Sequence, residues 1–305
     1  MNRYKKILLA GTLSVMSCSL IHAQELYKNE NAPVHERVAD LLSRLTVEEK
    51  ISLLRATSPG IPRLGIDKYY HGNEALHGVV RPGRFTVFPQ AIGLAATWNP
   101  NVVYQVGAAG GKEVKENNIA AWLTPALNIH RSPLCGRNFE YYSEDPLLAG
   151  VLAGAMVKGI QSQGVAATVK HFALNNKETD RKHSDSRVSE RAAREIYLKA
   201  FEYVIKGAKP WAVMSSYNII NGCYASENKE LLEDILRDEW GFDGMVTTDW
   251  WTLGEHYKEV KAGNDMKMAC GDPKRLKEAM DQGLLTRQDL EHCAERVLNL
   301  ILKLD

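Results

Sequence analysis

Short apolar runs recur along this chain of 305 residues, and segments with helix-like patterns separate them. Each run is nearly continuous in hydrophobicity and does not alternate, which is typical of parallel strands covered on both faces. Six runs are predicted to be strands: Ile92–Thr97, Ala121–Leu127, Val165–Val169, Ala212–Ser216, Met245–Thr248 and Asp265–Ala269. The pattern therefore predicts a largely parallel sheet.

The segments between the runs carry helix signals. Ser189–Ala208 and Arg287–Leu304 place apolar residues at intervals of three and four along one face, as amphipathic helices do. Several helix starts are marked by a capping side chain, in two cases followed by proline at the first helical position. These starts are Thr46-x-x-Glu49, Asn99-Pro100, Asp145-Pro146 and, more weakly, Thr286-x-x-Asp289.

Strands and helices alternate for about 270 residues with no linker, low-complexity stretch or internal repeat. We therefore predict one α/β domain over residues 24–305, a (β/α)8 TIM-type barrel. A doubly wound open sheet is the alternative, but the GxGxxG motif that such sheets use to bind dinucleotides follows none of the strands. Gly107, Gly110 and Gly111 fall within a helical pattern and do not form a phosphate loop.

The first 23 residues have a different character. Arg3, Lys5 and Lys6 precede an uncharged apolar run, and the small residue Ala23 ends the segment. This order is that of a secretory signal peptide, and the run is too short for a stable membrane span. In a competing interpretation Cys18 belongs to a lipobox and carries a lipid anchor. In both cases the mature protein is exported, to the periplasm or beyond.

Composition narrows the functional classes. The net charge of +1, without a basic cluster beyond the N-terminus, argues against a nucleic-acid partner. The cysteines show no CxxC spacing, so we expect neither a zinc site nor another metal or cofactor. Disulfides and free buried thiols both remain open for Cys135, Cys223, Cys270 and Cys293.

Polar side chains follow several predicted strands, at the face where barrel enzymes carry out their chemistry. One aspartate after a strand is more often a turn former or a helix cap, and a Lys-His pair is more often part of a solvated loop. Four such groups together predict one pocket with a carboxylate, cations and aromatic walls, which suits a neutral sugar. The groups are Asn73-Glu74 with His77, Lys170-His171, Tyr217-Asn218 and Asp249-Trp250-Trp251.

At these positions the sequence resembles family 3 glycoside hydrolases of the β-glucosidase and β-xylosidase type. The segment from Trp240 to Trp250 is similar to the nucleophile motif of that family, and further motifs follow the family's order from about Val34 to Asp305. They include Gly136–Glu140 with Glu144-Asp145-Pro146, Lys170-His171-Phe172, Asn175–Arg181 with Glu190-Arg191, and Val213–Asn218. A set of motifs in one order is far more specific than any single motif.

The resemblance implies a (β/α) barrel that hydrolyses terminal non-reducing β-D-glycosides with retention, and a disaccharide or oligosaccharide as substrate. Asp249 would be the nucleophile. The positions that match the family's sugar-binding residues are Glu74, Arg137, Lys170, His171, Arg181, Met214, Tyr217 and Trp250. We expect the neighbouring cations to favour the ionised form of Asp249, as nucleophilic attack requires.

Glu74 departs from the aspartate found in many members of the family. The sequence Glu74-Ala75-Leu76-His77-Gly78 is closer to the β-xylosidase type. The additional methylene group would fill space that a hydroxymethyl group otherwise occupies. This favours pentosides over hexosides only slightly, because one methylene group changes the discrimination between two substrates by about 1–3 kcal/mol.

The acid/base is the missing part of the predicted site. In most relatives it comes from a second α/β domain, which we expect to be absent here although the barrel would normally contact it. Single-domain relatives use an Asp-x-His dyad instead; at the corresponding positions this chain has Arg181 and His183. Two hypotheses follow: the nucleophile half of a retaining glycosidase, or a catalytically incomplete barrel that binds sugars.

Overall fold

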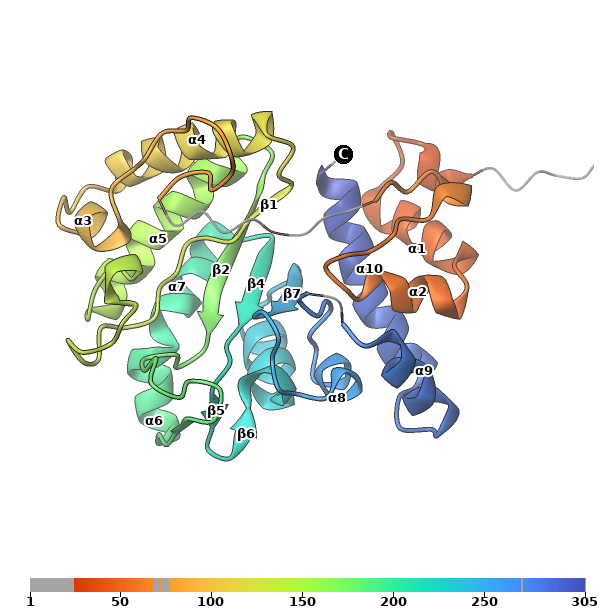
Figure 1. Ribbon diagram of the computed structural model, residues 1–305. Coiled ribbons are helices and arrows are strands. Elements are labelled where there is room, and N and C mark those ends of the chain that lie inside the picture. The colour runs from red at the N-terminus through yellow and green to blue at the C-terminus, as the bar shows by residue number, and fades with distance from the viewer. Residues whose placement is uncertain (1–24, 69–71, 73–76, 270, 305) are drawn as a thin grey trace, which may run out of the picture.

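Four parallel strands run side by side through the middle of the molecule (Figure 1). They are β1 (Ala121–Trp122), β2 (Ala166–Phe172), β4 (Ala212–Ser215) and β7 (Met245–Thr248), hydrogen-bonded in that order. Parallel bridges from Thr247 to Met266 and from Lys267 to Arg55 continue the arc beyond β7. The computed structural model describes residues 25–68, 72, 77–269 and 271–304. Within these residues the strand pairing forms an open arc that does not close into a ring.

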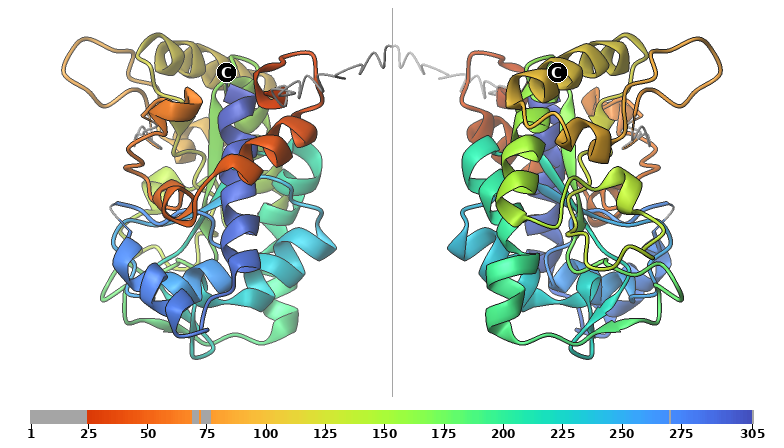
Figure 2. Two further views of the ribbon diagram at one scale, coloured as in Figure 1. Left: turned by 90° about the vertical axis from the view of Figure 1, so that its right-hand side faces the viewer. Right: turned by 90° about the vertical axis from the view of Figure 1, so that its left-hand side faces the viewer.

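Helices cover the strands on both sides (Figures 1 and 2). The α-helices are α1 (Val34–Arg44), α2 (Val47–Leu53), α3 (Ala91–Ala95), α4 (Pro100–Glu116), α5 (Pro146–Gln161), α6 (Glu190–Ala192), α7 (Lys199–Ala208), α8 (His256–Lys261), α9 (Pro273–Asp281) and α10 (Arg287–Leu304). Tighter 3-10 turns are η1 (Leu26–Lys28), η2 (Pro62–Leu64), η3 (Asn138–Glu140) and η5 (Ala225–Glu227). Wider π-helical segments are η4 (Ala193–Tyr197) and η6 (Glu230–Glu239).

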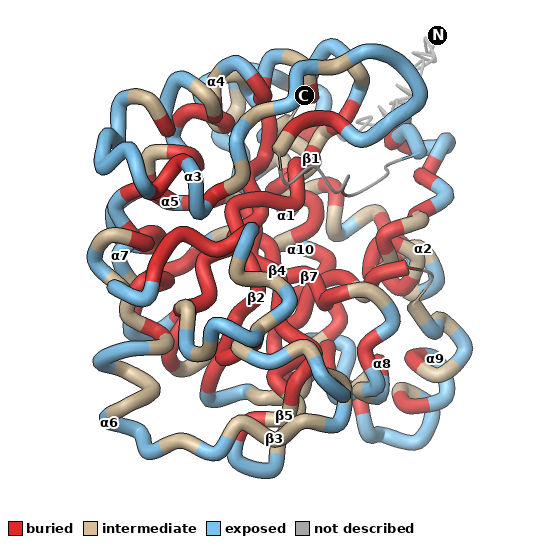
Figure 3. The backbone as a smooth tube through the Cα atoms, turned by 60° about the vertical axis from the view of Figure 1, so that its left-hand side comes forward, coloured by how far each residue is buried: buried red, intermediate tan, exposed pale blue. Residues whose placement is uncertain are grey.

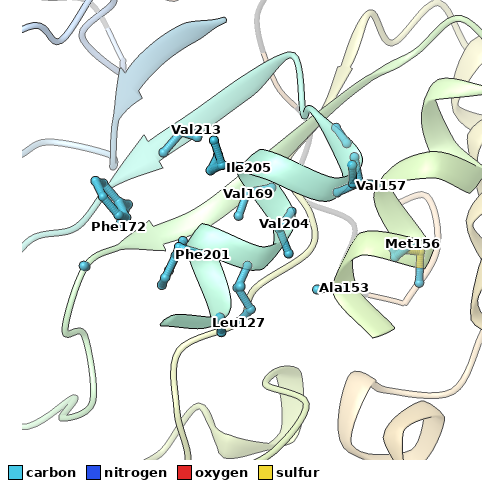
Figure 4. Close-up of a cluster of buried hydrophobic side chains, with 14 of the residues drawn as sticks. Leu127, Ala153, Met156, Val157, Val169, Phe172, Phe201, Val204, Ile205 and Val213 are labelled. Carbon is cyan, nitrogen blue, oxygen red and sulfur yellow. The ribbon is translucent and has the colours of Figure 1, made fainter. Parts of the chain in front are cut away.

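Alternate residues of each strand enter two different apolar cores. On one side Val169, Val213 and Val246 pack with α4, α5, α7 and η6 in what we term the outer core, part of which Figure 4 shows around Phe172 and Phe201. On the other side the inner core joins Met214 and Met245 to α1, α2 and α10. Since both faces of the strands are buried (Figure 3), their continuous hydrophobicity in the sequence is explained.

Glycines allow two outer helices to approach closely. A Cβ atom on Gly159 of α5 would lie 2.3 Å from the carbonyl oxygen of Tyr104 in α4, and one on Gly107 would lie 2.7 Å from the Met156 oxygen. These distances are far below van der Waals contact, so larger residues would force α4 and α5 apart. The glycines of this region are therefore packing residues within a helix, as their helical pattern predicts.

A buried charge network fixes the start of β7. One oxygen of Asp265 accepts hydrogen bonds from the Val246 amide at 2.7 Å and from Arg237 at 2.8 Å, and its other oxygen accepts from Arg296 at 3.2 Å. Arg296 also bonds Glu233 at 2.8 Å. The network thus joins η6 and β7 to α10, which follows them much later in the sequence.

A small second sheet holds the loops that follow β2 and β4. It pairs β3 (Asp185–Ser186) in parallel with β5 (Ile219–Ile220), which forms a hairpin with β6 (Cys223–Tyr224). The hairpin turn is Asn221-Gly222, with φ of 48° and 92°. Two positive φ values in succession are the requirement of a tight hairpin turn, and Asn-Gly meets it best. The hairpin was not predicted from the sequence.

Most of the predicted elements are confirmed. Five of the six apolar runs lie in strands or parallel bridges, and β7 has the predicted bounds. All four caps form, including the reciprocal bonds between Thr46 and Glu49 and between Thr286 and Asp289. The prediction of a strand at Ile92–Thr97 is wrong, because Ala91–Ala95 is the short helix α3. The predicted signal peptide and Cys18 lie outside the described residues.

Candidate active site

The polar residues predicted to act together come from the carboxyl ends of neighbouring strands. Lys170 and His171 stand near the end of β2, and Tyr217 lies two residues beyond β4. Asp249 directly follows β7, and its amide extends the sheet by donating to the Ser215 carbonyl at 3.1 Å. Because β2, β4 and β7 are adjacent in the sheet, these ends meet at one edge.

Asp249 has one occupied and one open carboxylate oxygen. Its side chain is buried, and Oδ1 accepts a hydrogen bond from the Trp250 amide at 2.7 Å. Oδ2 lies 3.6 Å from His171 Nε2 and receives no hydrogen bond of normal geometry from any described residue. A buried carboxylate oxygen without a partner is costly, and such atoms are a mark of functional sites. The geometry leaves Oδ2 available to a ligand.

The electrostatic surroundings act on Asp249 in both directions. Burial raises the pKa of Asp249 above its usual value, whereas the Trp250 amide, Lys170, Arg137 and Tyr217 lower it. The cations therefore have the predicted effect, but burial outweighs them and the net shift is upward. Burial and the same cationic surroundings hold the pKa of His171 well below its usual value, so its ring is neutral at pH 7.

His171 is fixed by groups around it. Its amide donates to Asn128 Oδ1, and the Asn128 side chain donates back to the His171 carbonyl, both at 2.9 Å. The ring of Tyr141 lies edge-on at 6.5 Å between centroids. A neutral imidazole held in this way can exchange hydrogen bonds with a ligand without adding a charge.

Each of the two arginines near the site is paired with a glutamate three residues away. Arg137 forms an ion pair with the buried Glu140, and Arg181 bonds Glu178 at 2.9 Å. The guanidinium of Arg181 lies 4.4 Å from the centroid of the Tyr217 ring, a cation–π contact. Arg137, Lys170 and Arg181 each help to lower the pKa of His171, so all three cations act on this ring.

The remaining predicted residues take different places. Met214 is fully buried in β4 and belongs to the inner core. Trp250 is half-buried, and its ring lies 5.6 Å from that of Trp251. His183 accepts or donates one hydrogen bond with Asp180 at 2.8 Å, and both side chains are exposed. Glu74 lies outside the described residues.

The structure adds residues that the sequence interpretation did not select. Glu140 and Glu178 orient the arginines, and Asn128 fixes His171. A spacing of three signals such pairs on helices, but Glu178 and Arg181 lie outside the helices and Arg137 precedes η3, so the sequence gives no clear signal for them. The described residues hold no group of three or more side chains suited to a metal ion, and Cys135, Cys223 and Cys293 are free thiols.

Comparison with known proteins identifies the family of this chain. Residues 47–300 match the model of the glycosyl hydrolase family 3 N-terminal domain. The chain belongs to glycosyl hydrolase family 3. Beta-glucosidase A of Butyrivibrio fibrisolvens is 65% identical over 206 residues, which cover 68% of this chain and 25% of the relative. An exo-alpha-(1->6)-L-arabinopyranosidase of Bifidobacterium longum is 46% identical over 219 residues, 72% of this chain and 29% of the relative.

A solved structure is similar over most of the chain. Beta-glucosidase 3B from Thermotoga neapolitana, in complex with alpha-D-glucose, aligns with a TM-score of 0.83 and 41% identity over 88% of this chain and 42% of its own. The N-terminal domains of this family are TIM-type barrels, so the predicted fold class and family are confirmed. This chain spans about a quarter to two fifths of the length of these relatives. No helix among the described residues is long and apolar enough to cross a membrane.

Proposed function

We propose that this chain hydrolyses terminal non-reducing β-D-glycosides by a retaining double displacement in which Asp249 is the nucleophile. One observation carries the proposal: the buried Asp249 carboxylate presents an oxygen without a hydrogen bond from the described residues, at the carboxyl edge of the sheet and among Arg137, Lys170 and His171. A carboxylate stripped of hydration and held by fixed donors on one side only is suited to attack an electrophilic carbon.

In this reaction Oδ2 of Asp249 attacks the anomeric carbon, and the bond to the leaving oxygen breaks with its electron pair. The glycosyl–enzyme ester then reacts with water, which releases the sugar and restores the carboxylate. Arg137, Arg181 and Lys170 would donate hydrogen bonds to the sugar hydroxyls, and charge-assisted bonds of this kind are about twice as strong as neutral ones. His171 would complete the pocket as a neutral partner.

A retaining glycosidase also needs a second carboxyl about 5–5.5 Å from the nucleophile, to protonate the leaving oxygen and then activate water. Glu140 and Glu178 are both committed to ion pairs with arginines. Each carboxylate is held by an arginine three residues away and is therefore not free to turn towards a leaving oxygen. This commitment favours the second candidate function, a sugar-binding barrel that lacks its own acid/base.

For the sugar we propose a β-glucoside first and a β-xyloside second. Relatives named beta-glucosidase support glucose, and the arabinopyranosidase is a relative that acts on a pentose. Glu74, with its longer side chain, favours the smaller sugar. Comparing 4-nitrophenyl β-D-glucoside with the β-D-xyloside by kcat/KM decides between them. We further propose that residues 1–23 export the protein, which N-terminal sequencing of the secreted form would test.

The decisive experiment traps the glycosyl–enzyme. The protein is incubated with a 2-deoxy-2-fluoro β-glycoside that has a dinitrophenyl leaving group. This group departs with little acid assistance, so the reagent tests the nucleophile even where the acid/base is absent. We expect mass spectrometry to place the label on Asp249, and Asp249→Asn to abolish it. Asp243→Asn is the matched control, because Asp243 is exposed and precedes the same strand. A label on any other carboxylate contradicts the assignment.

A further inference from the structure

Trp251 combines three properties that seldom occur together. It lies two residues after Asp249, its side chain is 66% exposed, and its backbone has a φ of 51°. A bulky residue in the left-handed region is strained, and an exposed indole gains little from packing to offset that strain. Residues held in this way concentrate at functional sites.

Hydrogen bonds and an ion pair hold the residues that directly follow Trp251 in place. Thr252 is buried, and its hydroxyl donates to Glu259 Oε1 at 2.6 Å. The Lys267 ammonium donates to the Gly254 carbonyl at 2.8 Å and to Thr252 Oγ1 at 3.1 Å, and it forms an ion pair with Glu259. The exposed indole therefore stands on a rigid support.

A second tie connects Trp251 to the predicted sugar pocket. The Lys182 ammonium donates to the Trp251 carbonyl at 3.0 Å and lies 5.2 Å from the centroid of the Tyr217 ring. Arg181 contacts the same ring at 4.4 Å, and Tyr217 is one of the groups that act on Asp249. Trp251 is thus held at the outer end of a chain of contacts that leads inward to the nucleophile.

We propose that the exposed face of Trp251 is a wall of the subsite that receives the leaving group of the glycoside. The sugar that is attacked must reach the buried oxygen of Asp249, so an exposed aromatic beside it lies on the side of the departing group. A flat indole recognises the C–H face of a pyranose ring or an aromatic aglycone. Trp251 therefore selects glycosides with a ring-shaped leaving group. This inference rests on the proposed function.

The test measures binding, so that it does not depend on turnover. Calorimetry gives the dissociation constants of two ligands, glucose and phenyl 1-thio-β-D-glucopyranoside, which resists hydrolysis. We expect Trp251→Gly, which removes the ring and tolerates the backbone angle, to weaken the thioglycoside about three- to tenfold and to leave glucose unchanged. Trp251→Phe should recover most of the loss. Trp98→Gly is the matched control, since Trp98 is 73% exposed, also has a φ of 51°, and lies between α3 and α4.

The outcomes separate this inference from the function on which it rests. If the native chain binds neither probe, the proposed function fails and the inference fails with it. If the native chain binds both probes and Trp251→Gly changes neither affinity, or weakens both equally, the leaving-group assignment alone is overturned. A loss in Trp98→Gly as large as that in Trp251→Gly overturns it as well.

Discussion

His256 should make this protein less stable in acid by an amount that the structure allows us to calculate. The imidazole is buried at the first position of α8, and its Nδ1 accepts a hydrogen bond from the Asp272 amide at 2.9 Å. Protonation of Nδ1 would replace this bond with two opposed N–H groups. Burial, followed by repulsion from Lys267, lowers the pKa of His256 to about 4 from its usual 6.5.

The sign and size follow from proton linkage. Between pH 6.5 and about 4 the unfolded chain binds this proton and the folded chain does not, so stability falls as the pH falls through that window. One pH unit is worth about 1.36 kcal/mol, and about 2.5 units therefore give about 3 kcal/mol. Above pH 6.5 His256 adds no pH dependence to the free energy of unfolding, because it is neutral in both the folded and the unfolded chain.

We expect His256→Asn to remove this contribution, because the asparagine oxygen can still accept from the Asp272 amide but cannot be protonated. Urea unfolding followed by tryptophan fluorescence at pH 7.5, 6, 5 and 4 gives the free energy of unfolding of both proteins. Lost packing lowers the variant by a constant amount, while the difference between the proteins should shrink by about 3 kcal/mol towards pH 4. Parallel curves for the two proteins would refute the reasoning.

Three further predictions concern the site. Arg181→Ala should weaken glycoside binding by about 1.5–3 kcal/mol, the value of a charge-assisted hydrogen bond; unchanged affinity by calorimetry would mean that Arg181 does not reach the sugar. Because burial raises the pKa of Asp249 and attack requires its ionised form, the acid limb of kcat/KM should have its midpoint above pH 3.8, and a midpoint at or below this value contradicts the assignment. Hydrolysis rates of aryl glycosides should fall steeply as the pKa of the leaving group rises. A flat dependence would contradict this expectation. If that flat dependence became steep in His183→Ala, the Asp180–His183 pair would be the proton donor.

The sequence predicts those features that depend on local patterns. The β7 strand is found at its correct bounds because Gly244 and Asp249 interrupt an otherwise apolar run. The prediction for Ile92–Thr97 fails because a largely apolar run of this length is as compatible with a short helix as with a strand, and only Ile92 and Thr97 are β-branched. The Asn221-Gly222 dipeptide was a sufficient signal for the hairpin, although the run beside it is only two residues long.

The site is predictable in its members but not in its arrangement. Lys170 and His171 stand out because they are polar residues near the end of an apolar strand, and Asp249 stands out because it directly follows one. That one carboxylate oxygen is occupied by the Trp250 amide and the other is open depends on tertiary geometry, which no spacing encodes. The balance between burial and cations at Asp249 is likewise a property of the folded protein, and the sequence gives only the sign of each contribution.

The two cores differ in when they can form during synthesis on the ribosome. Most of the outer core lies in one continuous stretch, because α4, α5 and α7 leave the ribosome together with β2 and β4. The inner core needs α1 near one end of the described chain and α10 near the other, which lie side by side in the finished fold (Figure 1). The apolar face of α1 therefore remains uncovered until Arg287–Leu304 has been translated. A nascent chain that pauses before this helix exposes a face that chaperones recognise.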